Sequence, residues 1–417
     1  MNAPAAPRVL IQKFGGSSLA TAELREIAAS RVLEARTRGY APVVVCSAMG
    51  RSPEVYATDT LLALLGPARS GPNRDLLGAV GELIACAVFA ELLSSWGATA
   101  QAMTGAQAGI RTSSNWGDAG IESVEPGNLV AAIVAGIIPV VAGFQGADSS
   151  GAITTLGRGG SDLTAIAIGD VLGAEEVEIY TDVSGVMSGD PRRIAGAHTV
   201  GRVNWSEMVE LAGNGAKVMH AKAATYAQRA NTPYVIKGLR SNFGTAIDEG
   251  TTVDRERPVT GVTSLKDIAF VRIIQGEENV TQRAALDRQL LRRIAERGAS
   301  IDMINVNSAG VFFVCDSENV EVVREELRDM NLAVRIRSHC AKISIVGAGM
   351  RGTPGVMYRV VRAVVDAGVE IIHSTDSNIT ISVLVPEEDA DRAEQALHDA
   401  FQLGRRDAPR HSEALQT

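Results

Sequence analysis

The segment Gly157–Asp162, with the sequence GRGGSD, decides the fold class when it is taken with Lys13–Ser18, which reads KFGGSS near the start of the chain. Both segments are glycine-rich turns that follow short apolar runs, and each carries one cation. Glycine leaves their backbone N–H groups open to an approaching anion. Two such turns predict a phosphorylated ligand and an anionic co-substrate held side by side. Either turn taken alone fits a plain strand-to-helix connection equally well.

Around these turns, the first two-thirds of the chain alternates strand-like and helix-like segments. We predict strands over Val9–Phe14, Ala41–Ser47, Ile137–Phe144 and Glu176–Thr181, and helices over Ala22–Thr37, Leu76–Trp96, Gly127–Ala135 and Ser161–Leu172. This alternation predicts an α/β fold with a mainly parallel sheet that helices cover on both faces. Ligands of such sheets bind at the carboxyl ends of the strands, which is where we expect the first glycine turn, Ser47–Ala48, Phe144 and Thr181–Asp182.

The pattern changes after about residue 257 to two similar β-α-β-β-α units, whose helix-ending glycines, Gly298 and Gly368, occupy corresponding places. Each unit resembles a small ferredoxin-like module with a sheet edge that could pair with its twin. We therefore predict three domains, which span residues 1–257, 258–338 and 339–417. Within the last unit, Gly347–Gly352 matches the dinucleotide pattern GxGxxG. We reject that function because the remaining chain is too short for a dinucleotide fold of two halves.

Composition narrows the class of protein further. The chain has 417 residues, of which 46% are hydrophobic and 21% charged, and a net charge of −8. This profile is typical of a globular protein and does not favour nucleic acid or an anionic membrane as a partner. Its four scattered cysteines favour a reducing compartment over a disulfide framework or a zinc site. We find no signal peptide and no stretch of about 20 apolar residues, so we expect a cytoplasmic protein.

Four charged side chains near the glycine turns are candidates for chemistry. Lys13 precedes two glycines at a strand end, where an ammonium can meet phosphate oxygens. Glu82 lies in an apolar helix, where a buried carboxylate would need a cation such as a substrate ammonium. Arg158 can bind a carboxylate with two parallel hydrogen bonds. Asp162 either orients cations or caps the following helix. The plainer alternatives are a surface Lys13, an exposed Glu82 and an Arg158 that bonds loop carbonyls.

A set of short segments, in this order, resembles the aspartate kinase family. The segments are Lys13–Ser18, Ser47–Gly50, Thr58–Asp59, Gly81–Glu82, Thr104–Gly109, Thr155–Asp162, Thr181–Asp182, Asp190–Arg192 and Gly215–Val218. The resemblance runs from about residue 8 to residue 403, and the two C-terminal units are similar to the ACT regulatory domains of that family. The diaminopimelate-sensitive, single-function class is indicated by Ala57–Leu65, Gly349–Met350, Pro354–Val356 and Ser374–Val385.

The resemblance implies ATP-dependent phosphorylation of the β-carboxylate of L-aspartate to 4-phospho-L-aspartate, at the start of lysine, threonine and methionine synthesis. A carboxylate is ionised at neutral pH, so positioning and charge neutralisation would replace a general base. The implied catalytic residues are Lys13 and Asp162. The implied nucleotide-binding residues are Lys13, Phe14, Gly15, Gly16, Thr181, Asp182, Met187, Arg192, Lys217 and Val218. The implied substrate-binding residues are Ser47, Thr58, Glu82, Arg158 and Ser161.

By the same resemblance, Mg²⁺ arrives with ATP and needs no dedicated protein ligands. An amino-acid effector (diaminopimelate, lysine or threonine) would bind the ACT domains, which would also join the chain into a homo-oligomer. The implied effector residues are Ser300, Asp302, Val356, Glu370, Ile371, Ser377 and Asn378.

Four residues depart from the family pattern. Met187 stands where a tyrosine is usual and Ser184 where an aspartate is usual, while Ala221–Lys222 replaces a Pro-Arg pair. Met187 can still pack against a purine. Two alternatives therefore stay open: another amino-acid kinase of the same fold that acts on glutamate, carbamate or a nucleotide, and a non-catalytic amino-acid sensor.

Overall fold

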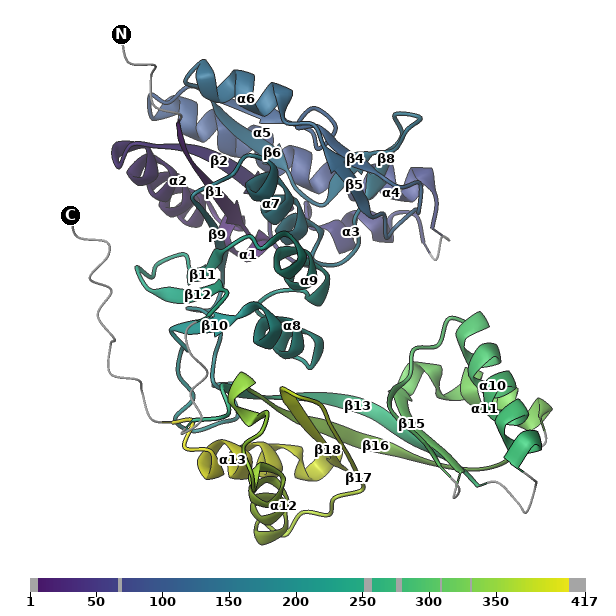
Figure 1. Cartoon of the computed structure of the whole chain (residues 1–417). Helices are drawn as coiled ribbons and strands as arrows, with labels where there is room; N and C mark the ends of the chain where they lie inside the picture. The colour runs from purple at the N-terminus through teal and green to yellow at the C-terminus, as the bar shows by residue number, and fades with distance from the viewer. Residues whose placement is uncertain are drawn as a thin grey trace. The chain divides into compact units, whose positions relative to one another are not determined.

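The structure is a computed structural model that describes residues 7–66, 70–250, 257–274, 280–307, 310–330 and 332–404. It divides into two compact units. The first holds Met1–Met187 and Thr199–Thr252, and the second holds Ser188–His198 and Val253–Thr417. Both units are drawn in Figure 1.

The first unit is built on an eight-stranded sheet with the order β10-β12-β11-β9-β1-β2-β6-β3. All neighbouring strands are parallel except the pair β11 and β12. Strands β2 and β6 are almost wholly buried, which explains their continuous apolar sequences. The bounds are β1 Arg8–Phe14, β2 Tyr40–Cys46, β3 Ala100–Met103, β6 Ile138–Ala142, β9 Glu176–Thr181, β10 Arg202–Asn204, β11 Tyr234–Gly238 and β12 Gly244–Asp248.

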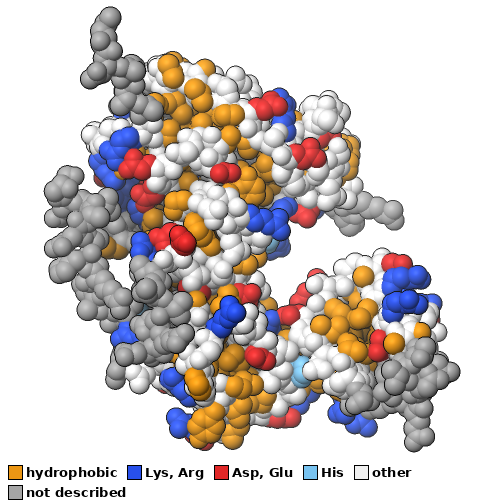
Figure 2. All heavy atoms as spheres, viewed as in Figure 1, with side chains coloured by type: hydrophobic (Ala, Val, Ile, Leu, Met, Phe, Trp, Pro, Cys, Tyr) orange, Lys and Arg blue, Asp and Glu red, His pale blue; other side chains and the backbone are white. Residues whose placement is uncertain are grey.

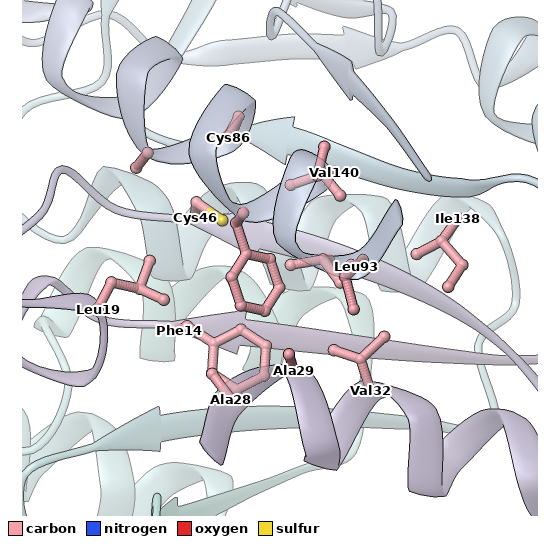
Figure 3. Packing of buried hydrophobic residues seen from close by; sticks show 14 of the residues in the cluster. Phe14, Leu19, Ala28, Ala29, Val32, Cys46, Cys86, Leu93, Ile138 and Val140 are labelled. Atoms are coloured by element: carbon pink, nitrogen blue, oxygen red, sulfur yellow. The ribbon is translucent and has the colours of Figure 1, made fainter. Parts of the chain in front are cut away.

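Helices cover the sheet on both faces: α7 packs against β1, β2 and β9 on one face, and α2 and α5 pack against β1, β2 and β6 on the other (Figure 1). Figure 3 shows the core on that face, where Phe14 of β1 meets Ala28 and Val32 of α2 and Leu93 of α5. The Phe14 ring stacks on Tyr180 with centroids 4.9 Å apart. The bounds are α1 Gly16–Leu19, α2 Ala22–Thr37, α3 Thr58–Ala63, α4 Pro72–Gly78, α5 Val80–Ser95, α6 Gly127–Val134, α7 Gly160–Val171, α8 Trp205–Gly213 and α9 Ala221–Ala230. The predicted α/β fold with a mainly parallel sheet is confirmed.

A second, four-stranded sheet with the order β5-β4-β7-β8 leads into the GRGGSD turn. Its strands are β4 Ile110–Thr112, β5 Ile121–Val124, β7 Gln145–Ala147 and β8 Ile153–Thr155. Beside it, the helix predicted over Leu76–Trp96 is wrong in one respect, because it divides at Ala79 into α4 and α5. Asp75 of α4 accepts hydrogen bonds from the backbone N–H groups of Gly117 and Thr155, which ties α4 to a neighbouring loop and to the end of β8.

The stretch Pro72–Ser95 corrects the expectation that no segment is long and apolar enough for a bilayer. This stretch is long and apolar enough by length and composition alone, with a mean hydropathy of 2.0 over its most apolar part. Half of that part is buried inside the structure, and α5 contributes Phe89 and Leu93 to the core of the first unit. The core helix of a globular protein has the same composition.

The second unit contains one six-stranded sheet with the order β14-β15-β13-β16-β18-β17. Its strands are β13 Gly261–Ile274, β14 Asp302–Asn307, β15 Gly310–Asp316, β16 Ala333–Val346, β17 His373–Asp376 and β18 Thr380–Pro386. The two long strands run antiparallel, so that Val262 pairs with Ile345 and Ile273 with Val334. Each long strand therefore serves both modules, one half in each.

Among the described residues, four helices and three 3₁₀ turns complete the two modules: α10 Val280–Glu296, η1 Ser317–Asn319, α11 Val320–Asp329, η2 Ala348–Met350, α12 Val356–Asp366, η3 Glu387–Asp389 and α13 Ala390–Ala400. The pairing of β17 with β18 begins only at His373, and residues 369–372 precede it. Val369 instead fills the core beneath α12 and α13. On the outer face of α12, Figure 2 shows gathered apolar side chains, which include Tyr358 and Val365.

The division predicted by residue number stays a prediction, and the structure differs from it at two points. The first half of β13 pairs with the second module's half of β16, although the prediction assigns all of β13 to the first module. Residues 188–198 belong to the second unit, although the prediction assigns them to the first. In both cases the pairing and packing of distant segments decide the boundary.

Candidate active site

The first feature of the site is a buried ion pair between the two glycine turns. The Lys13 Nζ lies 2.5 Å from Asp162 Oδ1, with Lys13 at the end of β1 and Asp162 in the first turn of α7. The two residues are 8% and 9% exposed. Lys13 is therefore not a surface side chain. Asp162 does not cap α7 either, because the N-cap residue is Gly159 and no side-chain cap bond is present.

The turn after β1 packs directly on the turn after β2. The Gly50 N–H donates to Gly16 O at 3.0 Å, and a Cβ on Gly16 would lie 2.5 Å from Ala48 O. No larger residue fits at position 16 without moving this backbone. Gly15 N–H already donates to Tyr180 O at 3.3 Å, so one of the two predicted phosphate-binding amides has a partner within the chain.

Glu82 is a buried carboxylate with one oxygen left free. It lies in the first turn of α5 and is 3% exposed, so the alternative of an exposed helix glutamate is wrong. Its Oε1 accepts from the Ala48 N–H at 3.1 Å, whereas its Oε2 has no hydrogen-bond partner among the described residues. Burial raises the pKa of Glu82 from 4.5 to about 7, although the bond from Ala48 opposes this shift. Such a group attracts a cation.

The GRGGSD turn presents Arg158 to solvent. Gly157 and Gly159 adopt positive φ angles of 73° and 74°, a region that favours glycine, and a Cβ on Gly159 would lie 2.2 Å from the Cβ of His220. Arg158 is exposed and makes no hydrogen bond or ion pair within the described parts of the chain, so it does not bond loop carbonyls. Its guanidinium is available for a carboxylate.

Sequence reasoning missed the residue that holds this turn in place. Lys222 Nζ donates to Leu156 O at 2.9 Å, to Ala119 O at 3.2 Å and to Asp118 Oδ1 at 2.8 Å. The only sequence feature that pointed to Lys222 was its departure from the family pattern, in which a Pro-Arg pair occupies the place of Ala221–Lys222. Asp75 was missed as well, because an acidic residue in a short helix carries no sign of the two N–H groups it accepts from.

The remaining predicted substrate residues lie on the same loops and helices. Ser47 directly follows β2 and donates its N–H to Phe14 O at 3.0 Å. Thr58 begins α3, and Ser161 is a buried residue in the first turn of α7. A Cβ on Gly143 would lie 2.7 Å from the Ser161 Cβ, so the chain after β6 approaches α7 closely.

The predicted nucleotide residues divide between the two units. Thr181 and Asp182 follow β9, and Thr181 Oγ1 donates to Asp182 Oδ1 at 3.0 Å. Lys217 is exposed, Val218 is half-buried, and Met187 pairs with Thr199 in an isolated bridge. These residues belong to the first unit, whereas Arg192 belongs to the second, where Asp190 holds its guanidinium through two bonds of 3.0 and 2.8 Å.

The predicted effector residues lie in the second unit, and two of their carboxylates are already paired. Asp302 binds the Nζ of the buried Lys342, and Glu370 accepts two bonds from Arg337 at 3.1 and 2.9 Å. The Ser377 hydroxyl accepts the N–H of Thr380 at 3.1 Å. The other predicted effector residues are the exposed Ser300 and Asn378, the half-buried Ile371 and the buried Val356.

These positions define what the site can do. The turns after β1 and β2 and the start of α7 place an ammonium, a free carboxylate oxygen and an exposed guanidinium on neighbouring loops of one unit. Ala48 links two parts of this set, since its N–H binds Glu82 and its carbonyl faces Gly16. The arrangement suits a zwitterionic ligand beside a phosphate group. Among the residues that the structure describes, no three His, Cys, Asp or Glu side chains gather as metal ligands do.

Comparison with known proteins identifies what this chain is similar to. Residues 8–238 match the model of the amino acid kinase family, and residues 343–401 match an ACT domain model. Aspartokinase 1 of Bacillus subtilis is 37% identical over 414 residues, which cover 95% of this chain and 100% of that protein. E. coli aspartokinase III in complex with aspartate and ADP (R-state) has a TM-score of 0.78 at 22% identity, over 94% of this chain and 99% of that one. The same E. coli enzyme in complex with lysine and aspartate (T-state) has a TM-score of 0.73 at 22% identity, over the same shares of both chains.

Proposed function

This chain belongs to the aspartokinases, within the amino acid kinase family, and on that premise we propose that it transfers the γ-phosphoryl group of ATP to the β-carboxylate of L-aspartate, forming 4-phospho-L-aspartate. The observation that carries the proposal is the unpartnered Oε2 of Glu82, a buried carboxylate oxygen that is ready for the α-ammonium of an amino acid. Arg158 would hold the α-carboxylate, because its guanidinium has no partner within the described chain.

The proposed transfer requires charge neutralisation more than acid–base chemistry. The β-carboxylate of aspartate is ionised at neutral pH and can attack without a base. The Lys13 ammonium would neutralise charge on the transferred phosphoryl group, and Asp162 would hold that ammonium in place through the 2.5 Å ion pair. Gly16, which has no side chain, would let the phosphates approach the loop backbone. Ser47, Thr58 and Ser161 would flank the substrate.

The nucleotide would be held by residues that follow β9 and precede α9. We assign Thr181, Asp182, Met187, Arg192, Lys217 and Val218 to it, together with Lys13, Phe14, Gly15 and Gly16. Mg²⁺ would arrive with ATP, because phosphate and water oxygens can supply most of its ligands.

We also propose feedback regulation through the second unit. The match of residues 343–401 to an ACT domain supports it, as does the sharing of β13 and β16 between two modules. An amino acid (diaminopimelate, lysine or threonine) would bind near Ser300, Asp302, Val356, Glu370, Ile371, Ser377 and Asn378. Its ammonium would compete with Lys342 for Asp302 or with Arg337 for Glu370.

Three further assignments complete the proposal. The enzyme would serve the pathway that makes lysine, threonine and methionine, and it would act in the cytoplasm. Edge strands β14 and β17 end the six-stranded sheet of the second unit, and an edge strand can pair with a second chain. We therefore propose a homo-oligomer that forms through the ACT modules.

The test is the formation of acyl hydroxamate from ATP, aspartate and hydroxylamine, with ADP release measured in parallel. We expect product with aspartate and much less with glutamate, although one methylene alone gives only about 1–3 kcal/mol of discrimination. A glutamate-specific or carbamate-specific enzyme would show the reverse order in the same acceptor panel. Unchanged rates with lysine, threonine and diaminopimelate, alone and combined, would remove the regulatory part of the proposal.

A further inference from the structure

One segment of the chain leaves the first unit and packs with the second. Residues 188–198 are joined covalently to the first unit at Met187 and Thr199, yet they cluster with the second unit. A hydrogen bond of 2.9 Å from Ser188 N to His198 O closes the base of this segment. The segment carries Arg192, which stands ten positions after Asp182 in the chain.

Arg193 joins this segment to helix α13. Its Nη1 lies 3.1 Å from Glu394 Oε2 and 3.3 Å from Asp391 Oδ1, both on α13, and it donates to Ser264 Oγ on β13 at 2.8 Å. Its Nε and Nη2 lie 3.3 and 3.2 Å from Asp190 Oδ2. Asp190 in turn binds Arg192, and these bonds hold the pKa of Asp190 well below its usual range. A continuous chain of charges therefore leads from α13 to Arg192.

The carboxylate of α13 that Arg193 contacts is buried. Glu394 is 0% exposed, and burial raises its pKa even though Arg193 and Ser264 contact it. Its Oε1 has no hydrogen-bond partner among the described residues. Removing the cation would leave an uncompensated carboxylate in the core. The contact between Arg193 and Glu394 is thus sensitive to any shift of α13.

Three other contacts fix the segment against the same module. Ile194 is 2% exposed and belongs to the core that α12 and α13 enclose. Gln395 Oε1 accepts the N–H of Ala195 at 2.8 Å, and the Ser188 hydroxyl lies 3.0 Å from His398 Nε2. Every one of these partners lies on the helix that follows β18 or in the core beneath it.

We propose that Arg193 and Glu394 are positioning residues for nucleotide binding, through which the second unit sets the affinity of the enzyme for ATP. The inference rests on the proposed nucleotide role of Arg192. The regulatory signal would pass from the module that contains β17 and β18, through helix α13, to residues 190–192. An effector that shifts α13 would then change ATP affinity more than aspartate affinity.

The experiment compares four full-length variants by calorimetric titration with ATP and Mg²⁺, and by KM for aspartate. Glu394→Gln keeps the shape of the side chain and the bond from Ser264 but removes the charge. Arg193→Lys keeps the positive charge but loses the several N–H donors of the guanidinium. We expect both to weaken ATP binding about 5- to 10-fold while KM for aspartate changes less than about twofold. Arg192→Ala tests the nucleotide role itself. Glu326→Gln is the matched control, since Glu326 is a buried helix glutamate of the other module and pairs with Arg293 and Arg297.

The outcomes separate the two claims. Wild-type ATP affinity in folded Glu394→Gln and Arg193→Lys, beside weakened binding in Arg192→Ala, would overturn the inference and leave the proposed function standing. Unchanged ATP binding in Arg192→Ala would remove the nucleotide role on which the inference rests, and the inference with it. Equal losses in Glu326→Gln and Glu394→Gln would show a general loss of stability, which also overturns it. Thermal melting curves establish that each variant is folded.

Discussion

The substitution Glu82→Gln should weaken substrate binding and stabilise the free enzyme at the same time. Glu82 is 3% exposed, its Oε1 accepts from Ala48 N–H at 3.1 Å, and its Oε2 has no partner among the described residues. Glutamine has the same shape and keeps the bond from Ala48. The substitution removes only the negative charge, so its effects on substrate binding and on stability can be measured separately.

The loss in binding follows from the proposed contact with the substrate ammonium. A hydrogen bond to a charged group contributes about 1.5–3 kcal/mol, so KM for aspartate should rise about 10- to 150-fold. The pH dependence gives a second signature, because the pKa of Glu82 is raised to about 7. In the wild type, KM should rise about tenfold for each pH unit below 7, since the carboxylate must be ionised to bind. In Glu82→Gln that dependence should disappear.

The effect on stability has the opposite sign. Burial raises the pKa of Glu82 from 4.5 to about 7, so the folded state binds the proton more tightly than the unfolded state. Below pH 4.5 the group is neutral in both states and costs nothing. As the pH rises through about 7, the folded protein loses about 3 kcal/mol of stability, which the glutamine variant keeps. The variant should therefore be more stable than the wild type at pH 8 and equal to it near pH 4.5.

Urea unfolding at several pH values and ADP release between pH 5.5 and 8.5 measure the two effects. Glu91→Gln is the control, because Glu91 lies on the same helix but is exposed. It should change neither KM nor the pH dependence of stability. A KM for aspartate within twofold of the wild type in Glu82→Gln would refute the ammonium contact. An unchanged free energy of unfolding at pH 8 would refute the account of the raised pKa.

Three other substitutions test the rest of the site. Lys13→Ala removes the ammonium at the strand end and should lower kcat at least about 100-fold in ADP release, with Lys13→Arg partly active; full activity in Lys13→Ala would contradict the catalytic role. Gly16→Ala places a Cβ 2.5 Å from a backbone carbonyl and should cost about 1–3 kcal/mol in urea unfolding. Gly127→Ala has nothing within 4 Å and should be neutral or stabilising, so equal losses in both would refute the steric argument. Lys222→Met releases Leu156 O and should raise KM for aspartate about 5- to 30-fold, with Lys222→Arg near the wild type; an unchanged KM would show that the turn holds its shape without this lysine.

Local patterns predicted the architecture because their causes are local. A parallel strand that is buried on both faces is usually apolar along its length, and β2 and β6 are. The glycine turns were predictable for the same reason, since only glycine adopts the backbone of Gly157 and Gly159 without strain. The order of the short segments was enough to predict the family, which the comparisons with known proteins confirm.

Burial and pairing could not be predicted in the same way. Glu82 and Glu91 occupy one helix, and only packing against Ala48 makes the first a buried, half-partnered carboxylate while the second stays exposed. Lys222 reaches the GRGGSD turn from 66 residues away in sequence. The β13 and β16 strands each serve two modules, because their halves pair out of sequence order.

The sequence and the tertiary structure therefore determined different features of this protein. The sequence alone determined the fold class, the family and the two glycine turns, because these depend on residue type and periodicity along the chain. Tertiary structure alone decided that Lys13 pairs with Asp162, that Glu82 keeps a free oxygen, and that residues 188–198 belong with α13. These features depend on contacts between residues that are far apart in the sequence, because such contacts decide which groups are buried away from water. A local sequence pattern does not predict those contacts.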